Sequence, residues 1–224
     1  MKEKDNIIII SGDFLDKGYN IPGVIEFIHK NIHKLKVVIG NHENFVYKYL
    51  KGKINKKSIS EDLINEYFNS IIILEKDDIL KNKFFEIYEH SFAFFIHKNF
   101  IITHAPCEKK YLGKISNEAL KAKRDFRYTK RKDFESFSEY IHAFDEDTKF
   151  LKDESDDFYP LHVFGHVVTK EISKYKNKIA IDTGCASGGK LTSIIIGDDL
   201  SISSKFVSAR IKTKKEEAIL NFFN

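Results

Sequence analysis

The chain has 224 residues, 42% of them hydrophobic, which is enough apolar material for the core of one large domain or two small ones. Its net charge of +4 comes from lysines spread over polar stretches, which permits nucleic-acid binding without indicating it. No apolar run approaches the roughly 18 to 20 residues that cross a bilayer, and residues 1–5 are too acidic for a signal peptide, so we expect a cytoplasmic protein. Two cysteines, Cys107 and Cys185, cannot build a disulfide framework, and we expect both to be reduced.

The N-terminal part of the chain predicts a strand, a helix and a second strand. The apolar run over residues 7–11 is typical of a buried strand. A helix over residues 22–35 opens with Pro22, which suits a first helical turn because no backbone N–H is needed there. A strand over residues 36–39 follows. Two strands joined by a helix favour a parallel pair with a right-handed crossover.

Helices and strands follow each other less regularly further along. We expect a helix over residues 43–50 that ends near Gly52, a helix over residues 58–68 that opens with a capping box of Ser58 and Glu61, and a third over residues 78–90. The apolar runs at residues 92–97 and 100–104 are separated by two residues, which is typical of a β-hairpin. Four further strands are predicted, over residues 161–164, 178–182, 191–196 and 200–209.

A polar segment separates the hairpin from the last strands. Residues 108–158 are rich in charged side chains, and we expect them to form a helical insertion or cap near the functional site. We expect residues 1–211 to form one domain that includes this insertion. Residues 212–224 are expected to be an exposed C-terminal tail.

Four predicted strands are followed by side chains that commonly bind metals. Asp13 follows the first strand, Asn41 the second, His104 the hairpin and His166 the strand over residues 161–164. Because strand ends hold loops on a rigid edge, these side chains can gather around one ion. A carboxylate, an amide oxygen and two imidazoles form a mixed oxygen and nitrogen set, which suits manganese, iron or zinc better than calcium.

Arginine is rare in this lysine-rich chain, and three of the four arginines cluster. Arg124, Arg127 and Arg131 have the spacing that aligns side chains on one face of a helix. A guanidinium binds phosphate through two parallel hydrogen bonds, which an ammonium cannot do. The cluster therefore indicates either phosphate capture or an ordinary solvated basic face, and the sequence leaves both open.

Five short motifs occur in order along the chain. They are Gly12-Asp13-Phe14-Leu15-Asp16-Lys17-Gly18, Gly40-Asn41-His42-Glu43, Thr103-His104-Ala105-Pro106, Gly165-His166-Val167, and Asp182-Thr183-Gly184-Cys185 with Gly188-Gly189-Lys190-Leu191. Together they resemble the motifs of the calcineurin-like metallophosphoesterases, in the branch that includes Ser/Thr protein phosphatases, dinucleoside tetraphosphatases and bacterial polynucleotide phosphatases. The resemblance covers about residues 7–196 and implies an α/β fold in which a two-sheet β sandwich is flanked by helices.

The resemblance also implies the metal ligands. Asp13 would bridge two metal ions, while Asn41, His104 and His166 would complete the second site. The implied cofactor is a divalent transition metal, manganese first, with iron or zinc as alternatives. The implied activity is hydrolysis of phosphomonoesters by metal-activated water.

Catalytic and phosphate-binding residues follow from the same motifs. By resemblance, His42 would be the general acid for the leaving oxygen, held and charged by Asp16. Lys17 and Asn41 would contact the phosphate, together with the cluster Arg124, Arg127 and Arg131. The expected partner is a phosphorylated protein, a nucleotide or a nucleic-acid end, with no membrane involved, and the motifs do not rank these substrates.

Two features depart from the family pattern. The family opens with an Asp-x-His motif on a first strand, but Asp-x-His occurs nowhere in this chain and only twelve residues precede Asp13. We therefore expect a sheet that lacks its first strand, one well-held metal and a weak second site. Lys17 stands where the family has an arginine, which keeps the charge but loses the fork geometry.

The missing motif leaves three interpretations. In the first, the chain is a working phosphoesterase, with a labile second metal or with the missing segment supplied by another polypeptide. In the second, it is a shortened form of a longer enzyme. In the third, it is a degenerate phosphatase fold that binds phosphorylated partners without efficient turnover.

Overall fold

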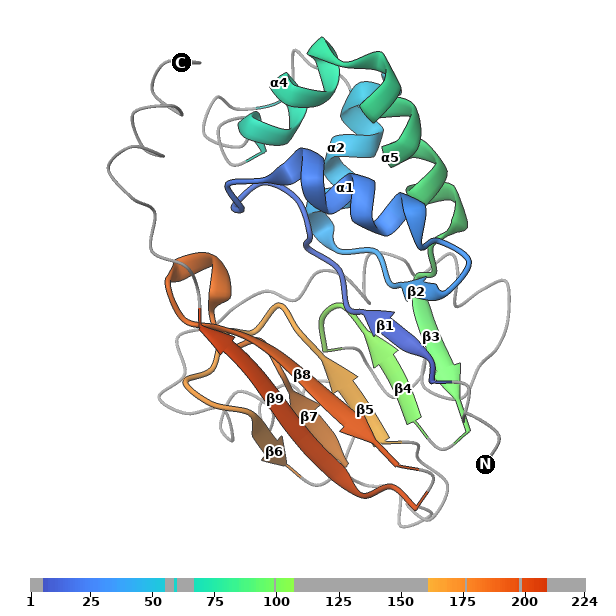
Figure 1. Ribbon diagram of the computed structural model, residues 1–224. Coiled ribbons are helices and arrows are strands. Elements are labelled where there is room, and N and C mark those ends of the chain that lie inside the picture. Colours follow the sequence, from blue (N-terminus) through green and yellow to red (C-terminus); the bar gives the residue numbers. More distant parts are fainter. Residues whose placement is uncertain are drawn as a thin grey trace.

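The computed structural model describes residues 6–54, 59, 67–98, 100–106, 161–175, 177–197 and 199–208. The predicted cap at 108–158 and the predicted tail at 212–224 lie outside the described residues, as does nearly all of the predicted helix at 58–68. Figure 1 shows α1, α2, α4 and α5 gathered above the strands.

The chain begins with the predicted strand, helix and strand. They are β1 (Ile8–Ile10), α1 (Ile21–Lys30) and β2 (Leu35–Val37), and the two strands pair in parallel as expected. The helix ends at Lys30, five residues earlier than predicted, because a turn then leads the chain into β2. The prediction of a buried first strand is wrong, since the side chain of Ile8 is 57% exposed and those of Ile9 and Ile10 are partly exposed. Among the described residues β1 pairs only with β2.

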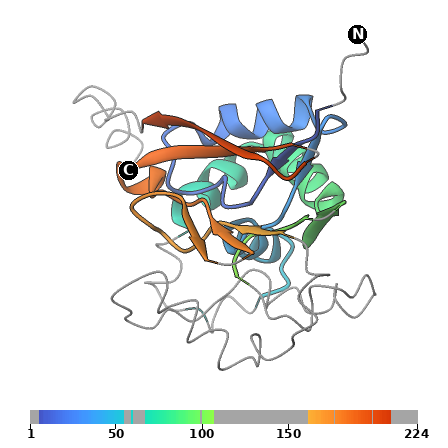
Figure 2. The same cartoon turned by 90° about the horizontal axis from the view of Figure 1, so that it is seen from below.

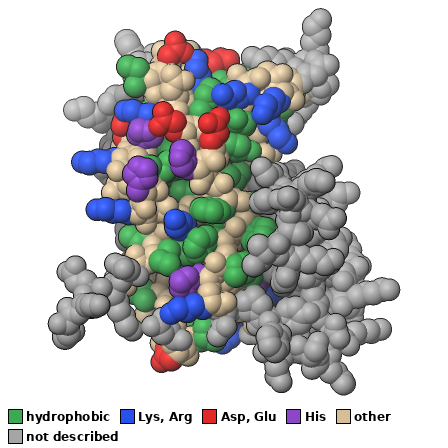
Figure 3. Space-filling model, turned by 90° about the vertical axis from the view of Figure 1, so that its right-hand side faces the viewer, with side chains coloured by type: hydrophobic (Ala, Val, Ile, Leu, Met, Phe, Trp, Pro, Cys, Tyr) green, Lys and Arg blue, Asp and Glu red, His purple; other side chains and the backbone are tan. Residues whose placement is uncertain are grey.

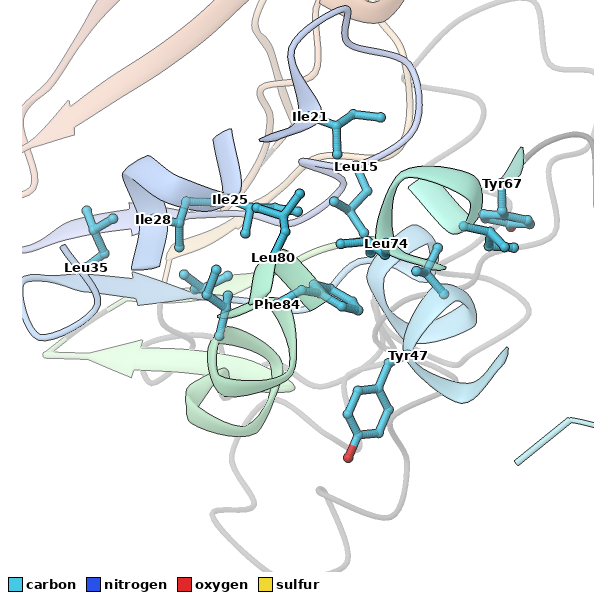
Figure 4. Close-up of a cluster of buried hydrophobic side chains, with 14 residues drawn as sticks. Leu15, Ile21, Ile25, Ile28, Leu35, Tyr47, Tyr67, Leu74, Leu80 and Phe84 are labelled. Carbon is cyan, nitrogen blue, oxygen red and sulfur yellow. The ribbon is translucent and has the colours of Figure 1, made fainter. Parts of the chain in front are cut away.

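Three further helices pack with α1 around an apolar cluster. They are α2 (Asn41–Leu50), α4 (Phe68–Lys76) and α5 (Asp78–His90). Figure 4 shows Ile25, Leu74 and Phe84 pointing toward one another from α1, α4 and α5, and all three are buried. The bounds of α5 match the prediction, α2 begins two residues earlier than predicted, and α4 was not predicted as a separate helix. Three adjacent isoleucines within α4 favour a strand by local preference, and packing on the other helices outweighs it.

The central sheet has five strands in the order β3-β4-β5-β7-β6. The strands β4, β5 and β7 run parallel to one another, and an antiparallel hairpin closes each edge. Their bounds are β3 (Phe94–His97), β4 (Phe100–Thr103), β5 (Leu161–Phe164), β6 (Ser173–Tyr175) and β7 (Lys178–Ala180). The hairpin and β5 confirm the prediction, whereas the short edge strand β6 was missed.

A second layer of strands covers this sheet. The hairpin of β8 (Lys190–Ile196) and β9 (Ile202–Ser208) crosses in front of β5 and β7 in Figure 1, and Figure 2 shows it on the opposite side of the molecule from that sheet. Ile194 and Ile196 of β8 pack against the cluster that contains Val163 and Ile179 of the five-stranded sheet. This packing forms the expected β sandwich, with the helices as a further layer.

One face of the molecule carries side chains of both charges. On the face in Figure 3, lysine, acidic and histidine side chains lie among hydrophobic ones. None of the helices in the described part of the chain has the length and apolar character that a bilayer-spanning segment needs.

The core of the sheet contains a histidine whose ionisation should affect stability. His162 on β5 is fully buried, and its Nε2 lies 2.8 Å from the hydroxyl oxygen of Thr103. That hydroxyl donates to the carbonyl oxygen of Ala105, so it accepts the His162 proton. Burial, assisted by the positive charge of the buried Lys178, lowers the pKa of His162 to about 3. The folded protein therefore holds this imidazole neutral.

We expect the buried His162 to make the protein lose stability in acid. Between about pH 6.5 and pH 3, His162 binds a proton in the unfolded chain but stays neutral in the folded protein. The free energy of unfolding therefore decreases by roughly 3–5 kcal/mol as the pH is lowered across that range. The variant His162→Gln removes this proton uptake, and its free energy of unfolding should depend less on pH. Urea unfolding of metal-free protein from pH 7.5 to 4.5 measures the difference, with exposed His33→Gln as the matched control. Parallel pH profiles for wild type and His162→Gln would contradict the assignment.

Candidate functional site

Four side chains predicted from separate motifs meet at one point. The Nε2 atom of His104 lies 3.0 Å from Asn41 Oδ1, 3.2 Å from Asp13 Oδ2 and 3.2 Å from His166 Nδ1. These residues follow β1, β2, β4 and β5, so four strands end at the same edge. The ligand atoms of Asp13, His104 and His166 all lie within 4.8 Å of one another, as atoms around one metal ion do.

The protonation of His104 decides what this cluster can hold. Its Nδ1 lies 2.8 Å from the carbonyl oxygen of Ser11, which can only accept a hydrogen bond. Nδ1 therefore carries a proton, and in the neutral ring Nε2 presents a lone pair. That lone pair faces the oxygens of Asp13 and Asn41, which also carry lone pairs. A positive charge between them, either a proton or a cation, is needed to offset this repulsion.

The electrostatics of the cluster support this account. Burial by itself lowers the pKa of His104, but the charge of Asp13 and the hydrogen bond to it outweigh burial and raise that pKa. Burial likewise raises the pKa of Asp13, but the charge of His104 outweighs it and holds that pKa well below its usual range. Burial, followed by the charge of His104, lowers the pKa of His166 to about 4. At neutral pH Asp13 is thus a carboxylate and His166 a neutral base, both suited to bind a cation.

Glycine and unusual backbone angles bring the loops this close. Gly12 has a φ of 88°, and a Cβ there would lie 2.6 Å from the backbone nitrogen of Gly40 and 2.8 Å from His104 Nδ1. Asp13 and His166 themselves have φ of 54° and 67°, in the left-handed region that L-residues seldom adopt. Backbone strain of this kind persists only where the surrounding structure holds it.

A second buried pair lies beside the cluster. His42 Nδ1 lies 2.6 Å from Asp16 Oδ2, and because a carboxylate only accepts, Nδ1 donates. The opposite ring nitrogen, Nε2, faces Asp13 Oδ2 at 4.0 Å. Burial lowers the pKa of His42, but the hydrogen bond to Asp16 and the charge of Asp13 outweigh burial and raise it. The ring is thereby held in one orientation and favoured in its charged form.

Two buried residues that support the site were not predicted. Ser70 on α4 accepts a hydrogen bond from the backbone N–H of Asp16 at 2.9 Å, and its own N–H donates to the Asp16 carboxylate. Glu43 on α2 accepts hydrogen bonds from the backbone N–H groups of Asp13, Leu15 and Gly40. Its position three residues after the cap of α2 is the available sequence signal, because an acid there often reaches back to the cap. No signal in the sequence points to Ser70.

A cavity of about 320 Å³ opens next to the cluster. Asp13, His42 and His166 line one part of it, and residues 182–187 together with the start of β8 at residues 190–192 line another. Lys17 and the exposed Lys190 add positive charge to the lining. The predicted phosphate-binding residues Arg124, Arg127 and Arg131 lie outside the described residues. Cys185 lines the cavity as a free thiol, as expected, and Cys107 is not described.

Comparison with known proteins identifies the family. The calcineurin-like phosphoesterase model matches residues 1–199. This chain belongs to that family. The asymmetrical bis(5'-nucleosyl)-tetraphosphatase PrpE of Oceanobacillus iheyensis is 32% identical over 193 residues, which cover 83% of this chain and 72% of the relative. The protein of the same name from Bacillus subtilis is 27% identical over 198 residues, which cover 85% and 75% of the two chains.

Membership of the family gives the class of reaction and of cofactor. The protein is a metal-dependent phosphatase, a hydrolase that acts on phosphoric ester bonds. Enzymes of this family use divalent metals, and the residues around His104 fit one: a carboxylate, an amide oxygen and imidazole lone pairs converge on one buried point. Within the described residues this is the single group of three or more acidic, histidine or cysteine side chains with ligand atoms so close.

We expect removal of His166 to weaken cation binding by this phosphoesterase. The variant His166→Gly deletes one imidazole, and glycine accepts the positive φ without strain. Loss of a direct ligand should lower the affinity for Mn²⁺ more than 100-fold, since loss of a group that only orients a ligand costs roughly 10–100-fold. Isothermal titration of EDTA-treated protein measures it, with exposed His33→Gly as control. Equal Mn²⁺ affinity in wild type and His166→Gly would rule out this ligand set.

Proposed function

We propose that this phosphoesterase hydrolyses nucleoside polyphosphates, with dinucleoside tetraphosphates as the first substrates to test. One observation carries the proposal: three ligand-type side chains converge on His104 Nε2, and a charged His42–Asp16 pair lies beside them. The relatives named bis(5'-nucleosyl)-tetraphosphatase support the choice of substrate among the phosphoryl compounds that such a site can accept.

We assign the cation site to Asp13, Asn41, His104 and His166. The mixed oxygen and nitrogen set supports manganese first, with iron or zinc as alternatives. When bound, the cation supplies positive charge against the phosphoryl oxygens and acidifies the attacking water. The described residues offer one such cluster, so we assign one well-held cation to this chain and treat a second as weak.

His42 has the geometry of a general acid. Its Nδ1 proton is committed to Asp16, so the proton available for transfer is on Nε2. Because its pKa is raised, the ring carries that proton near neutral pH. As water adds to phosphorus and the bond to the leaving oxygen breaks, the Nε2 proton passes to that oxygen. Asp16 then stabilises the orientation of the neutral ring until it is protonated again.

Lys17 and Asn41 hold the phosphoryl group in this proposal. Lys17 lies on the same loop as Asp13 and lines the cavity with an exposed side chain. An ammonium offers charge without the paired geometry of a guanidinium, so it tolerates phosphates in several orientations. This tolerance suits a polyphosphate chain, in which neighbouring phosphates resemble one another.

The substrate assignment is tested by turnover of the purified, Mn²⁺-loaded chain on a panel of phosphoryl compounds. We expect P1,P4-di(adenosine-5') tetraphosphate to be cleaved with a higher kcat/KM than phosphoserine peptides or phosphate-ended oligonucleotides. Asp13→Asn serves as the inactive control. Preference for phosphopeptides would overturn the nucleotide assignment. Binding of these compounds without turnover would favour the phosphate-binding module, and turnover by the chain alone would argue against a required complementing segment.

We expect the effect of His42→Asn to depend on the leaving group. An alkoxide needs a proton far more than a phosphate or p-nitrophenolate does, since these leave readily as anions. The variant should therefore lose roughly 10²–10⁴-fold in kcat on an alkyl phosphomonoester and much less on dinucleoside tetraphosphate or p-nitrophenyl phosphate. Steady-state kinetics at saturating Mn²⁺ measure both losses, with exposed His33→Asn as control. An equal loss on all three substrates would remove the general-acid role from His42.

A further inference from the structure

Glu43 is a buried acid to which the proposed chemistry assigns no task. It lies in the first turn of α2 with 0% of its surface exposed. Its Oε2 accepts hydrogen bonds from the backbone N–H groups of Asp13 at 2.8 Å and Gly40 at 2.9 Å. Its Oε1 accepts a third from the backbone N–H of Leu15 at 3.1 Å. One carboxylate thus joins the loop after β1 to the loop after β2.

The two loops that Glu43 joins carry two of the proposed ligands. Asp13 is on the first loop, and Asn41 directly follows Gly40 on the second. The two loops pack so closely that a Cβ on Gly40 would lie 2.1 Å from Asp13 Oδ1 and 2.8 Å from Glu43 Oε2. The backbone N–H of His42 adds a further bond to Asp13 Oδ1 at 3.2 Å.

The backbone at Asp13 needs such support. Its φ of 54° lies in the left-handed region, which is unfavourable for an L-residue. The Glu43 carboxylate accepts hydrogen bonds from the backbone N–H groups of Asp13 and Leu15, so it holds the turn on both sides of Phe14. Hydrogen bonds to a charged acceptor are about twice as strong as neutral ones. Without them, the turn is free to relax and the Asp13 side chain to swing away from His104.

We propose that Glu43 is a positioning residue, whose buried carboxylate fixes Asp13 relative to Asn41 and so sets the affinity of the site for a divalent cation. This inference rests on the proposed cation site. The hydrogen bonds that Glu43 accepts come from backbone N–H groups and not from the ligand atoms of the cluster. Glu43 thus acts through the backbone of Asp13 and Gly40.

Two substitutions separate position from charge. Glu43→Gln keeps the shape of the side chain but has a single acceptor oxygen, so its NH₂ group faces at least one backbone N–H in either orientation. Glu43→Asp keeps the charge but is one methylene shorter and cannot reach all three N–H groups. If only negative charge near the cation mattered, Glu43→Asp would behave as wild type. If position matters, both variants lose affinity.

The test measures Mn²⁺ binding by titration calorimetry of EDTA-treated protein at pH 8. This pH is above the value of about 7 to which burial and the Asp13 charge raise the pKa of Glu43. We expect both variants to bind Mn²⁺ roughly 10–100-fold more weakly than wild type, with a broadened Mn²⁺ EPR signal from a looser ligand set. Glu86→Gln and Glu86→Asp on α5 are the matched controls, since Glu86 is exposed and pairs with His29. Affinity within twofold of wild type in Glu43→Gln, or in Glu43→Asp, would overturn the proposal.

A measurement on the wild type covers the case in which the variants fold poorly. The amide protons of Asp13, Leu15 and Gly40 should exchange slowly with solvent in the metal-free protein, because Glu43 accepts from all three. Exchange as fast as at exposed loop amides would overturn the proposal without any variant. This readout needs neither cation nor substrate, and wild-type Mn²⁺ binding tests the proposed site itself, so failure of one is distinguishable from failure of the other.

Discussion

The hydrogen bond from His104 Nδ1 to the Ser11 carbonyl is the constraint on which the site depends. It fixes which ring nitrogen carries the proton and turns the Nε2 lone pair toward Asp13, Asn41 and His166. Lone pairs that face one another are unfavourable in a buried place unless a positive charge lies among them. The protein therefore folds into an arrangement that is complete only with a cation or a proton. The glycines and left-handed residues of the loops make this close approach possible.

The site lies on the seam between two packing units. Asp13 and Asp16 follow β1, and Asn41 and His42 begin α2 of the helical cluster, whereas His104 and His166 follow strands of the five-stranded sheet. Backbone bonds join the units: Val38 forms a β-bridge with Phe92, and the Ile39 N–H donates to the Phe92 carbonyl oxygen. An ion bound by residues of both units stabilises the folded protein over the unfolded chain, by an amount that grows with its concentration. Metal binding and the packing of the two units are thus coupled.

The parts of the fold that sequence predicts are those that local pattern controls. The hairpin, α5 and the parallel pair of β1 and β2 follow from periodicity and spacing. The helix α4 does not, because its run of isoleucines favours a strand locally and tertiary packing decides. The exposure of Ile8 was also missed, since it depends on tertiary packing that an apolar run does not reveal. Motif order predicted that Asp13, Asn41, His104 and His166 belong to one site, but the buried contacts of Ser70 and Glu43 arise only from the packed backbone.

Two histidines of the site acquire opposite properties from their neighbours. His42 lies in the first turn of α2, shortly after β2, and His166 lies shortly after β5. Asp16 lies 2.6 Å from His42 and favours its charged form, so the pKa is raised. The Nδ1 atom of the half-buried His166 lies 3.2 Å from His104 Nε2, and burial followed by the charge of His104 lowers the pKa of His166 to about 4. Environments that separate the pKa values of two like groups commonly separate their roles in catalysis. A charged imidazolium can give one of its two protons to a leaving oxygen. A neutral imidazole has a nitrogen lone pair that can bind a cation.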